Sequence, residues 1–326
     1  MLRYILKRIL SMIPVLIGVS IIIFGLLSLT PGDPADTRFG ELVGEDVKES
    51  WREEQGLNDS VVVQYVHWIK NIVTKGDFGI SYKNDKPVLQ EVLQRFPTTF
   101  LMSVLLTFIA SGVGILLGVL AATHQKTWID DAARVLGMLG VSIPSFWMAL
   151  LLIVAFAVNL KWFPVSGWYG PKYWVLPATS MGLMSAATIM RYTRSSTLDC
   201  IRQDYVRTAR AKGQKERVVI WHHVFRNALI PIINGVGSLF SVTLAGTVVI
   251  ENIFSIPGLG RLMVDGINTR DYPKVRCAVF VLAIAQCLVN LLIDIAYAFV
   301  EPRIRSQYQE YGKKKKKKHK KEVAQV

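Results

Sequence analysis

Residues 96–125 read FPTTFLMSVLLTFIASGVGILLGVLAATHQ, thirty consecutive positions without Asp, Glu, Lys or Arg. A helix rises about 1.5 Å per residue, so about 20 residues cross a hydrocarbon core of about 30 Å. Because lipid offers no hydrogen-bond partners to the backbone, a segment of this length that lies in lipid must be helical. The stretch therefore predicts a membrane-spanning helix.

Five more uncharged runs accompany it, and the charged residues gather between them. Hydrophobic residues make up 51% of the 326 and charged residues 19%. A large soluble helical protein is the alternative, but its buried helices need only about 10–14 apolar residues. We therefore predict an all-α membrane protein with six transmembrane helices. The five further runs are 9–32, 135–160, 173–190, 227–250 and 277–293.

The charges of the connecting segments predict the topology, because Lys and Arg favour the cytoplasmic side. Residues 191–226 hold nine basic and three acidic residues, and residues 301–326 hold ten and three. Residues 33–95 hold eight basic and twelve acidic residues, so we expect a small extracytoplasmic segment there. Val62, Tyr65, Val66, Ile69 and Val73 recur in it at helical spacing. Both termini are predicted to be cytoplasmic.

This pattern divides the chain into four parts. Residues 1–32 form the N-terminal tail and a retained first span, because no small-x-small cleavage pattern follows the apolar run. Residues 33–95 form the extracytoplasmic segment, residues 96–300 a five-helix core, and residues 301–326 a basic tail. The lysine run 313–318 in that tail is compatible with a solvated segment that has no specific partner, and a contact with the lipid bilayer is favoured over one with nucleic acid.

Motifs for catalysis, nucleotide binding and metal binding are missing from the sequence. The one Gly-Lys pair, Gly312-Lys313, lies in the lysine tail and not in a P-loop, and no histidine is followed by Glu. We therefore predict no enzyme activity, no metal site and no cofactor on this chain. Asp294 is the one acid within a predicted span, because we expect the last span to continue to about residue 300. We expect a structural role for it, paired with Arg303 or Arg305.

The loop between the fourth and fifth predicted spans contains a short helix, within about 203–213. Four of its residues share one face at i, i+3, i+4, i+7, and Gly213 can end the helix. We expect small residues on the exposed face to admit another protein, and Arg207 with its neighbours to steer an acidic groove. A surface helix without a partner is the alternative that periodicity leaves open. The four residues are Tyr205, Thr208, Ala209 and Lys212.

This loop reads DYVRTARAKG over 204–213, with RNALIP following at 226–231. It resembles the coupling-helix loop of type I ABC importer permeases, in the spacing of the peptide and nickel permease family. The wider pattern Glu-Ala-Ala-x-x-x-Gly is met here only at Ala209 and Gly213, because Arg207 and Thr208 replace its first two residues. Other stretches that resemble the family are 30–35, 142–147, 251–262 and 294–303.

The resemblance implies the type I ABC importer fold in the inner membrane and a permease subunit that forms half of a translocation pathway. The implied partners are a second homologous permease, two ATPase subunits that bind ATP, and an extracytoplasmic solute-binding protein. Di- or oligopeptides are the expected solutes, with nickel chelates as a second class. Coupling by alternating access would then run through Tyr205, Arg207, Thr208, Ala209, Lys212 and Gly213.

Small polar residues within the fourth and fifth runs are candidates for lining the pathway. Side chains of this kind also mediate helix packing, so both roles stay open. An autonomous secondary transporter or channel is the alternative function, and an intramembrane enzyme is disfavoured because no G-x-S-G nucleophile is present. The candidates are Ser180, Ser185, Thr188, Asn234 and Ser241.

Overall fold

The computed structural model describes residues 2–40 and 42–300, and this part of the chain is built from helices. Two π-helices, η1 and η2, interrupt the α-helical order. The elements are α1 (Leu2–Ser28), α2 (Pro34–Phe39), α3 (Glu45–Glu54), α4 (Val61–Lys75), α5 (Val88–Thr123), α6 (Trp128–Ser142), α7 (Ser145–Leu152), η1 (Ile153–Asn159), α8 (Pro171–Ile201), α9 (Asp204–Ala211), α10 (Glu216–Val218), η2 (Val219–Phe225), α11 (Arg226–Gly246), α12 (Val248–Ile253), α13 (Leu259–Asn268) and α14 (Tyr272–Val300).

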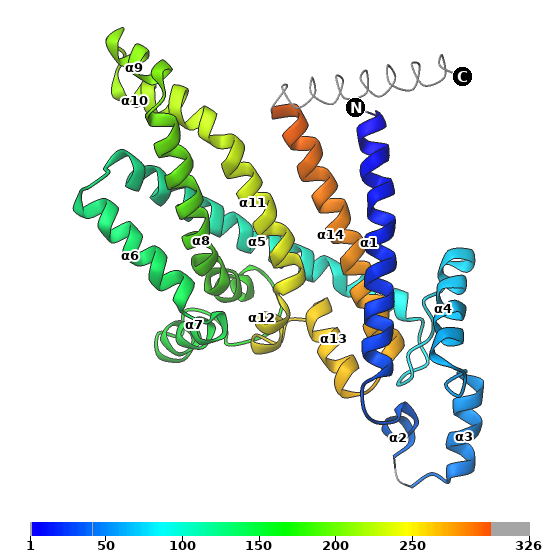
Figure 1. The fold of residues 1–326 in the computed structure, drawn as a ribbon. Coiled ribbons are helices and arrows are strands. Elements are labelled where there is room, and N and C mark those ends of the chain that lie inside the picture. Colours follow the sequence, from blue (N-terminus) through cyan, green and yellow to red (C-terminus); the bar gives the residue numbers. More distant parts are fainter. Residues whose placement is uncertain (1, 41, 301–326) are drawn as a thin grey trace, which may run out of the picture.

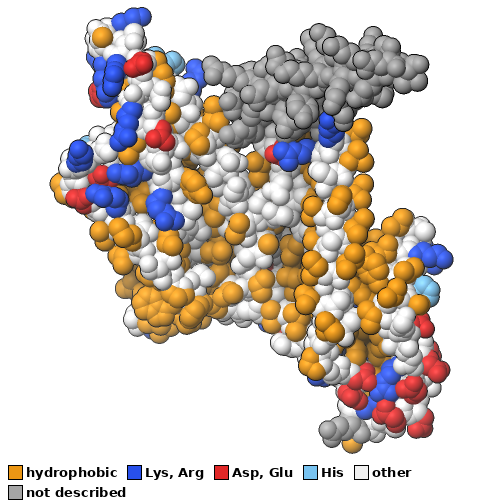
Figure 2. Space-filling model, viewed as in Figure 1, with side chains coloured by type: hydrophobic (Ala, Val, Ile, Leu, Met, Phe, Trp, Pro, Cys, Tyr) orange, Lys and Arg blue, Asp and Glu red, His pale blue; other side chains and the backbone are white. Residues whose placement is uncertain are grey.

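The long helices run back and forth between two ends of the molecule (Figure 1). One end carries α9 and the start of α1, and the opposite end carries α2, α3, α7 and α13. From the α9 end, α1, α6 and α11 lead toward the opposite end, and α5, α8 and α14 return. Hydrophobic side chains cover much of the middle of the molecule, whereas acidic side chains gather over α3 (Figure 2).

Four helical segments are long and apolar enough to cross a membrane: Ile5–Ser28, Val88–Thr123, Glu216–Gly246 and Tyr272–Ile295. The predicted run 135–160 is not one straight helix, because α6 and the α7–η1 segment meet at an angle of 101°. Pro144 lies at the break, and Ile143 before it has extended backbone angles. Proline disfavours a helical conformation in the preceding residue, which explains the bend.

Helix α8 contains the predicted run 173–190, but it is not among the four segments that are both long and apolar enough to cross a membrane. Its burial explains why: α8 lies against α5, α6, α7 and α11, so protein covers much of its surface. Small and hydroxylated residues are suited to such helix–helix contacts. The multi-pass membrane protein is confirmed, and the count of six spans stays a prediction.

Glycines allow α5 and α8 to approach each other closely. A Cβ placed on Gly114 would lie 2.7 Å from the carbonyl oxygen of Ala186, and one on Gly118 would lie 2.5 Å from Cβ of Thr193. Gly182 of α8 makes the reverse contact with α5. Side chains at these positions would push the two helices apart, so close packing fixes their separation.

Ionic contacts hold α6 to α8 and shape the segment between α1 and α5. Asp130 of α6 is buried and receives two hydrogen bonds from Arg194 of α8, at 2.7 and 2.8 Å.

In the segment after α1, Asp33 caps α2 by accepting from the Ala35 amide and also accepts from Arg52 of α3. These polar contacts add to a small buried cluster that includes Ala35, Trp51 and Tyr82.

The predicted amphipathic helix is confirmed as α4, and aromatic side chains form its packed face. Trp68 is buried and Ile72 is partly buried, and Tyr65 packs edge-on against Phe24 of α1. The valines at 62, 66 and 73 are exposed. The valine periodicity therefore indicated the helix, while Tyr65 and Trp68 make its contacts with Phe24 of α1.

We predict opposite effects of alanine at two glycines of α5. Gly118→Ala should lower the free energy of unfolding by about 1–3 kcal/mol, because the new methyl group overpacks the α8 contact. Gly112→Ala is the matched control, since no atom lies within 4 Å of its added Cβ. Alanine there should be neutral or stabilising, by up to about 1 kcal/mol. Thermal unfolding of the purified variants measures both, and equal midpoints would contradict the close contact.

Candidate functional site

Helix α9 occupies the predicted position in the loop between α8 and α11, and Gly213 follows its end. The backbone of Gly213 has φ +72°, a conformation that favours glycine. Its amide donates to the Arg210 carbonyl at 2.9 Å, and the Gln214 amide donates to the Ala209 carbonyl at 3.4 Å. These bonds satisfy the last carbonyls of the helix and confirm the role expected for Gly213.

The inner face of α9 is anchored to the transmembrane helices. Val206 is fully buried and Ala209 is nearly so, in a cluster with Val119 of α5 and Val219 and Val224 of η2. Ala209 was expected on the exposed face, and that expectation is wrong. Sequence reasoning also missed Val206, although its i, i+3 spacing from Ala209 signals an apolar pair.

The outer face of α9 is open to solvent and projects at one end of the molecule (Figure 1). Tyr205, Arg207, Thr208, Lys212 and Gly213 are all exposed in this chain. The Arg207 side chain is 76% exposed and lies 3.6 Å from Asp204, a contact that solvent weakens. Basic side chains gather at this tip (Figure 2). The face can therefore receive a partner without rearrangement of the anchor.

Electrostatic contacts also stiffen the end of α9. The Arg210 guanidinium donates to Glu216 of α10 at 2.6 Å, and this hydrogen bond raises the pKa of Arg210. Partial burial raises the pKa of the Tyr205 hydroxyl as well. Both groups keep their ordinary charge states at neutral pH. Arg210 is thus engaged within the chain, while Arg207 and Lys212 remain the freer cations of the outer face.

A second ordered site lies where α11 turns through α12 into α13. The Glu251 side chain is fully buried and accepts hydrogen bonds from the Thr99 hydroxyl at 2.7 Å, the Thr247 hydroxyl at 3.0 Å and the Arg261 amide at 3.0 Å. The Leu259 amide donates to the Thr99 oxygen at 2.8 Å. The carboxylate thereby lies at the N-terminus of α13, where the helix dipole favours negative charge.

Glycine is required around this carboxylate. A Cβ on Gly258 would overlap the Glu251 carboxyl group, and one on Gly260 would lie 2.6 Å from Cα of Val248. Ser255 also has positive φ, at +52°. Residues 251–262 were identified only by their resemblance to the family, and no role was predicted for Glu251. The available signal was an acid directly after an uncharged run and before a Pro-Gly turn.

The candidate pathway residues lie on α8 and α11 and differ in their burial. Ser180 is fully buried and donates to the Pro177 carbonyl at 2.8 Å, and Ser241 is buried and donates to Asn290 at 2.8 Å. The Ser241 bond joins α11 to α14, whereas the Ser180 bond stays within α8. Ser185 and Thr188 are partly buried, and Asn234 is exposed on α11.

Asp294 has a structural partner in the described part of the chain, but not one that we expected. Its carboxylate lies 3.0 Å from the guanidinium of Arg8, which joins α14 to α1. Arg303 and Arg305, the expected partners, lie outside the described residues. Pairing across two helices neutralises a charge that would otherwise be costly in the membrane.

No group of three or more His, Cys, Asp or Glu side chains is placed to hold a metal within residues 2–40 and 42–300. His222 and His223 are adjacent, and their rings are perpendicular with centroids 5.2 Å apart.

Comparison with known proteins decides the family. The pattern of the family described as "Binding-protein-dependent transport system inner membrane component" matches residues 114–306, and its N-terminal companion matches residues 1–103. The chain belongs to this family. It is a permease component of an ABC importer, in keeping with the named functions of its relatives.

Two relatives resemble this permease over nearly its whole length. A putative peptide transport system permease protein of Brucella abortus (strain 2308) is 40% identical over 309 residues, covering 92% of this chain and 98% of the relative. The glutathione transport system permease protein GsiC of Escherichia coli (strain K12) is 37% identical over 305 residues, covering 94% and 99%.

A solved structure supports the fold. An inward-facing form of the MetNI methionine ABC transporter matches this permease with a TM-score of 0.55 and 16% identity, covering 66% of this chain and 98% of that chain. A second crystal form of MetNI gives a TM-score of 0.56 at 15% identity. The permease therefore has the fold of ABC importer membrane subunits.

We predict that Glu251→Gln destabilises the permease. The glutamine amide nitrogen would replace one carboxylate oxygen, which now accepts from the two threonine hydroxyls or from the Arg261 amide. One buried donor would then lose its acceptor, which should lower the free energy of unfolding by about 1–3 kcal/mol. Glu53→Gln on exposed α3 is the control and should leave stability unchanged. Thermal unfolding in detergent measures both variants. A Glu251→Gln permease as stable as the control would show that the buried bonds do not hold this loop.

Proposed function

We propose that this permease forms half of the translocation pathway of an ATP-driven importer of di- or oligopeptides, with nickel chelates as the second solute class. The peptide assignment is supported by the relatives named as peptide and glutathione transport permeases. The proposed assembly contains a second homologous permease, two ATPase subunits that bind ATP, and an extracytoplasmic solute-binding protein.

The observation that carries the proposal is the two-faced structure of α9. Its inner face is fixed to α5 and η2 through Val206 and Ala209, and its outer face presents Tyr205, Arg207 and Thr208 to solvent. A partner that grips the outer face therefore moves the attached spans as one body. This transmission needs no reaction on the permease itself, so ATP hydrolysis belongs to the partner subunits.

We also propose the orientation of the permease in the inner membrane. The α9 end would face the cytoplasm together with both termini, and residues 33–95 would lie outside. The basic side chains near α9 and the acidic side chains over α3 support this assignment (Figure 2). In this arrangement the chain crosses six times, with the bent α6–α7–η1 segment as the third crossing and α8 as the fourth.

The α11 face that carries Asn234 is the proposed lining of the pathway. Asn234 and Ser238 are both exposed and lie four residues apart, so they share one side of the helix. Thr188 and Ser185 of α8 are partly buried and supply a weaker second contribution. Ser180 and Ser241 are buried in this chain, so the proposed lining does not rest on them.

The test replaces an exposed residue of α9 so that folding is preserved. Thr208→Trp should block seating of the ATPase subunit, and we expect loss of ATPase copurification and of ATP-driven peptide uptake. A bulky residue at Gly213 would be less informative, because positive φ there strains any side chain. Thr74→Trp is the matched control, because Thr74 is exposed on α4, away from α9. This variant should retain ATPase copurification and peptide uptake.

Normal uptake by the Thr208→Trp permease would overturn the proposed coupling face. The alternative, an autonomous secondary transporter or channel, has a separate signature. It predicts that the purified chain alone moves peptide into liposomes under an ion gradient, without ATP and without partner subunits.

A further inference from the structure

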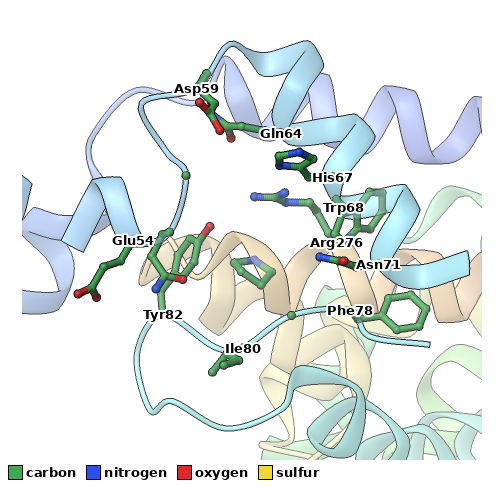
Figure 3. Close-up of a pocket in the computed structure, with 14 residues that line it drawn as sticks. Glu54, Asp59, Gln64, His67, Trp68, Asn71, Phe78, Ile80, Tyr82 and Arg276 are labelled. Atoms are coloured by element: carbon green, nitrogen blue, oxygen red, sulfur yellow. Dashed lines mark hydrogen bonds between the residues drawn. The ribbon is translucent and has the colours of Figure 1, made fainter. Parts of the chain in front are cut away.

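A cavity of about 250 Å³ lies between α4 and the first turns of α14. Four segments line it: the α3–α4 turn, α4, the segment that leads into α5, and α14. The cavity is separate from α8, α9 and α11, which carry the proposed pathway and coupling face. Figure 3 shows its residues converging from these segments around an open space.

The Arg276 guanidinium extends into this space near His67 (Figure 3). Only 8% of Arg276 is exposed, and its Cζ atom lies 4.4 Å from the centre of the Phe24 ring. Its Nε atom is buried without a hydrogen-bond partner, and no carboxylate among the described residues pairs with it. The hydroxyls of Tyr82 and Tyr272 are its polar neighbours, and neither carries the balancing charge.

A neighbouring cation on the same helix shows the contrast. Lys274 is also buried, and it pairs with Glu91 at 3.1 Å and with Asp271 at 3.0 Å. Removing a charge from water is costly unless a partner compensates for it. Lys274 has its compensation within the chain, whereas Arg276 lacks an anion within the described residues and faces a cavity.

The other walls supply further donors and apolar contacts. Trp68 also lines the cavity, and its indole Nε1 is buried in the wall without an acceptor. Trp68, Phe78 and Tyr82 provide aromatic surface, as is common in sites for small molecules. A guanidinium without a carboxylate partner among the described residues, at the wall of a small cavity, calls for a ligand that brings oxygen acceptors.

We propose that this cavity binds a small zwitterion, an amino acid or a dipeptide, through its carboxylate. The planar guanidinium of Arg276 matches a carboxylate with paired hydrogen bonds. Glu54 and Asp59 line the same cavity, so its lining also suits the ammonium group of such a molecule. The site is a second solute-binding place on the permease, outside the proposed pathway.

The test is calorimetric titration of the purified full-length permease in detergent with alanyl-alanine and with alanyl-alanine amide. The two probes differ in the carboxylate, and wild-type protein should bind the amide at least about ten-fold more weakly. Arg276→Gln should weaken dipeptide binding by a similar factor. Arg270→Gln is the matched control, because Arg270 bonds to Thr37 and does not line the cavity.

A second variant keeps the test decisive if Arg276→Gln fails to fold. His67 is exposed on α4, so His67→Glu should fold normally while it repels the carboxylate and weakens dipeptide binding. Absence of saturable dipeptide binding to wild-type protein would overturn the proposal. Equal affinity for the two probes, or unchanged affinity in folded Arg276→Gln or His67→Glu, would overturn it as well. Peptide uptake by the complete importer is a separate readout and tests the proposed function independently.

Discussion

The close approach of α5 and α8 is the contact on which the rest of the structure depends. Gly114 and Gly118 leave no room for a side chain between the two helices, so their backbones and small side chains meet directly. Within a membrane such packing is a main source of helix association, because lipid and apolar side chains are equally hydrophobic. Further contacts of α5 reach both ends of the molecule. Val119, one residue beyond Gly118, belongs to the cluster that seats α9, and Thr99 near the other end of α5 bonds to Glu251.

Charged side chains form contacts that join one helix to another or hold a loop in place. Asp130 joins α6 to α8 through Arg194, and Asp294 joins α14 to α1 through Arg8. Glu251 is satisfied without a cation, by hydroxyl and amide donors at the start of α13. Each joint lowers the freedom of one helix relative to another, because breaking it would leave a charge without a partner. A force applied to α9 can therefore be carried by α5 and α8 together.

Sequence patterns predicted the long helices because their cause is local. An uncharged run long enough to cross a bilayer is visible in the residues themselves, and so is the helix that ends before Gly213. The bend at Pro144 also has a local cause, but a run of apolar residues concealed it. Contacts between distant segments could not be found this way. The helical periodicity of the eight-residue α9 separates two faces without saying which is buried, and Ala209 was assigned to the wrong one. Likewise nothing near Asp294 in the sequence points to Arg8. Nothing near Arg276 in the sequence shows that no carboxylate of the described residues pairs with it.

The central claim is that α9 moves as one body with α5 and α8 when the partner ATPases bind ATP. Spin labels at Thr208 of α9 and Leu116 of α5, both exposed in this chain, measure it directly by pulsed electron resonance in the assembled importer. We predict the same distance distribution with and without ATP, while the distance between α9 and the second permease changes. A shift of the Thr208–Leu116 distance by about 5 Å, one helical turn, would contradict rigid transmission through this frame.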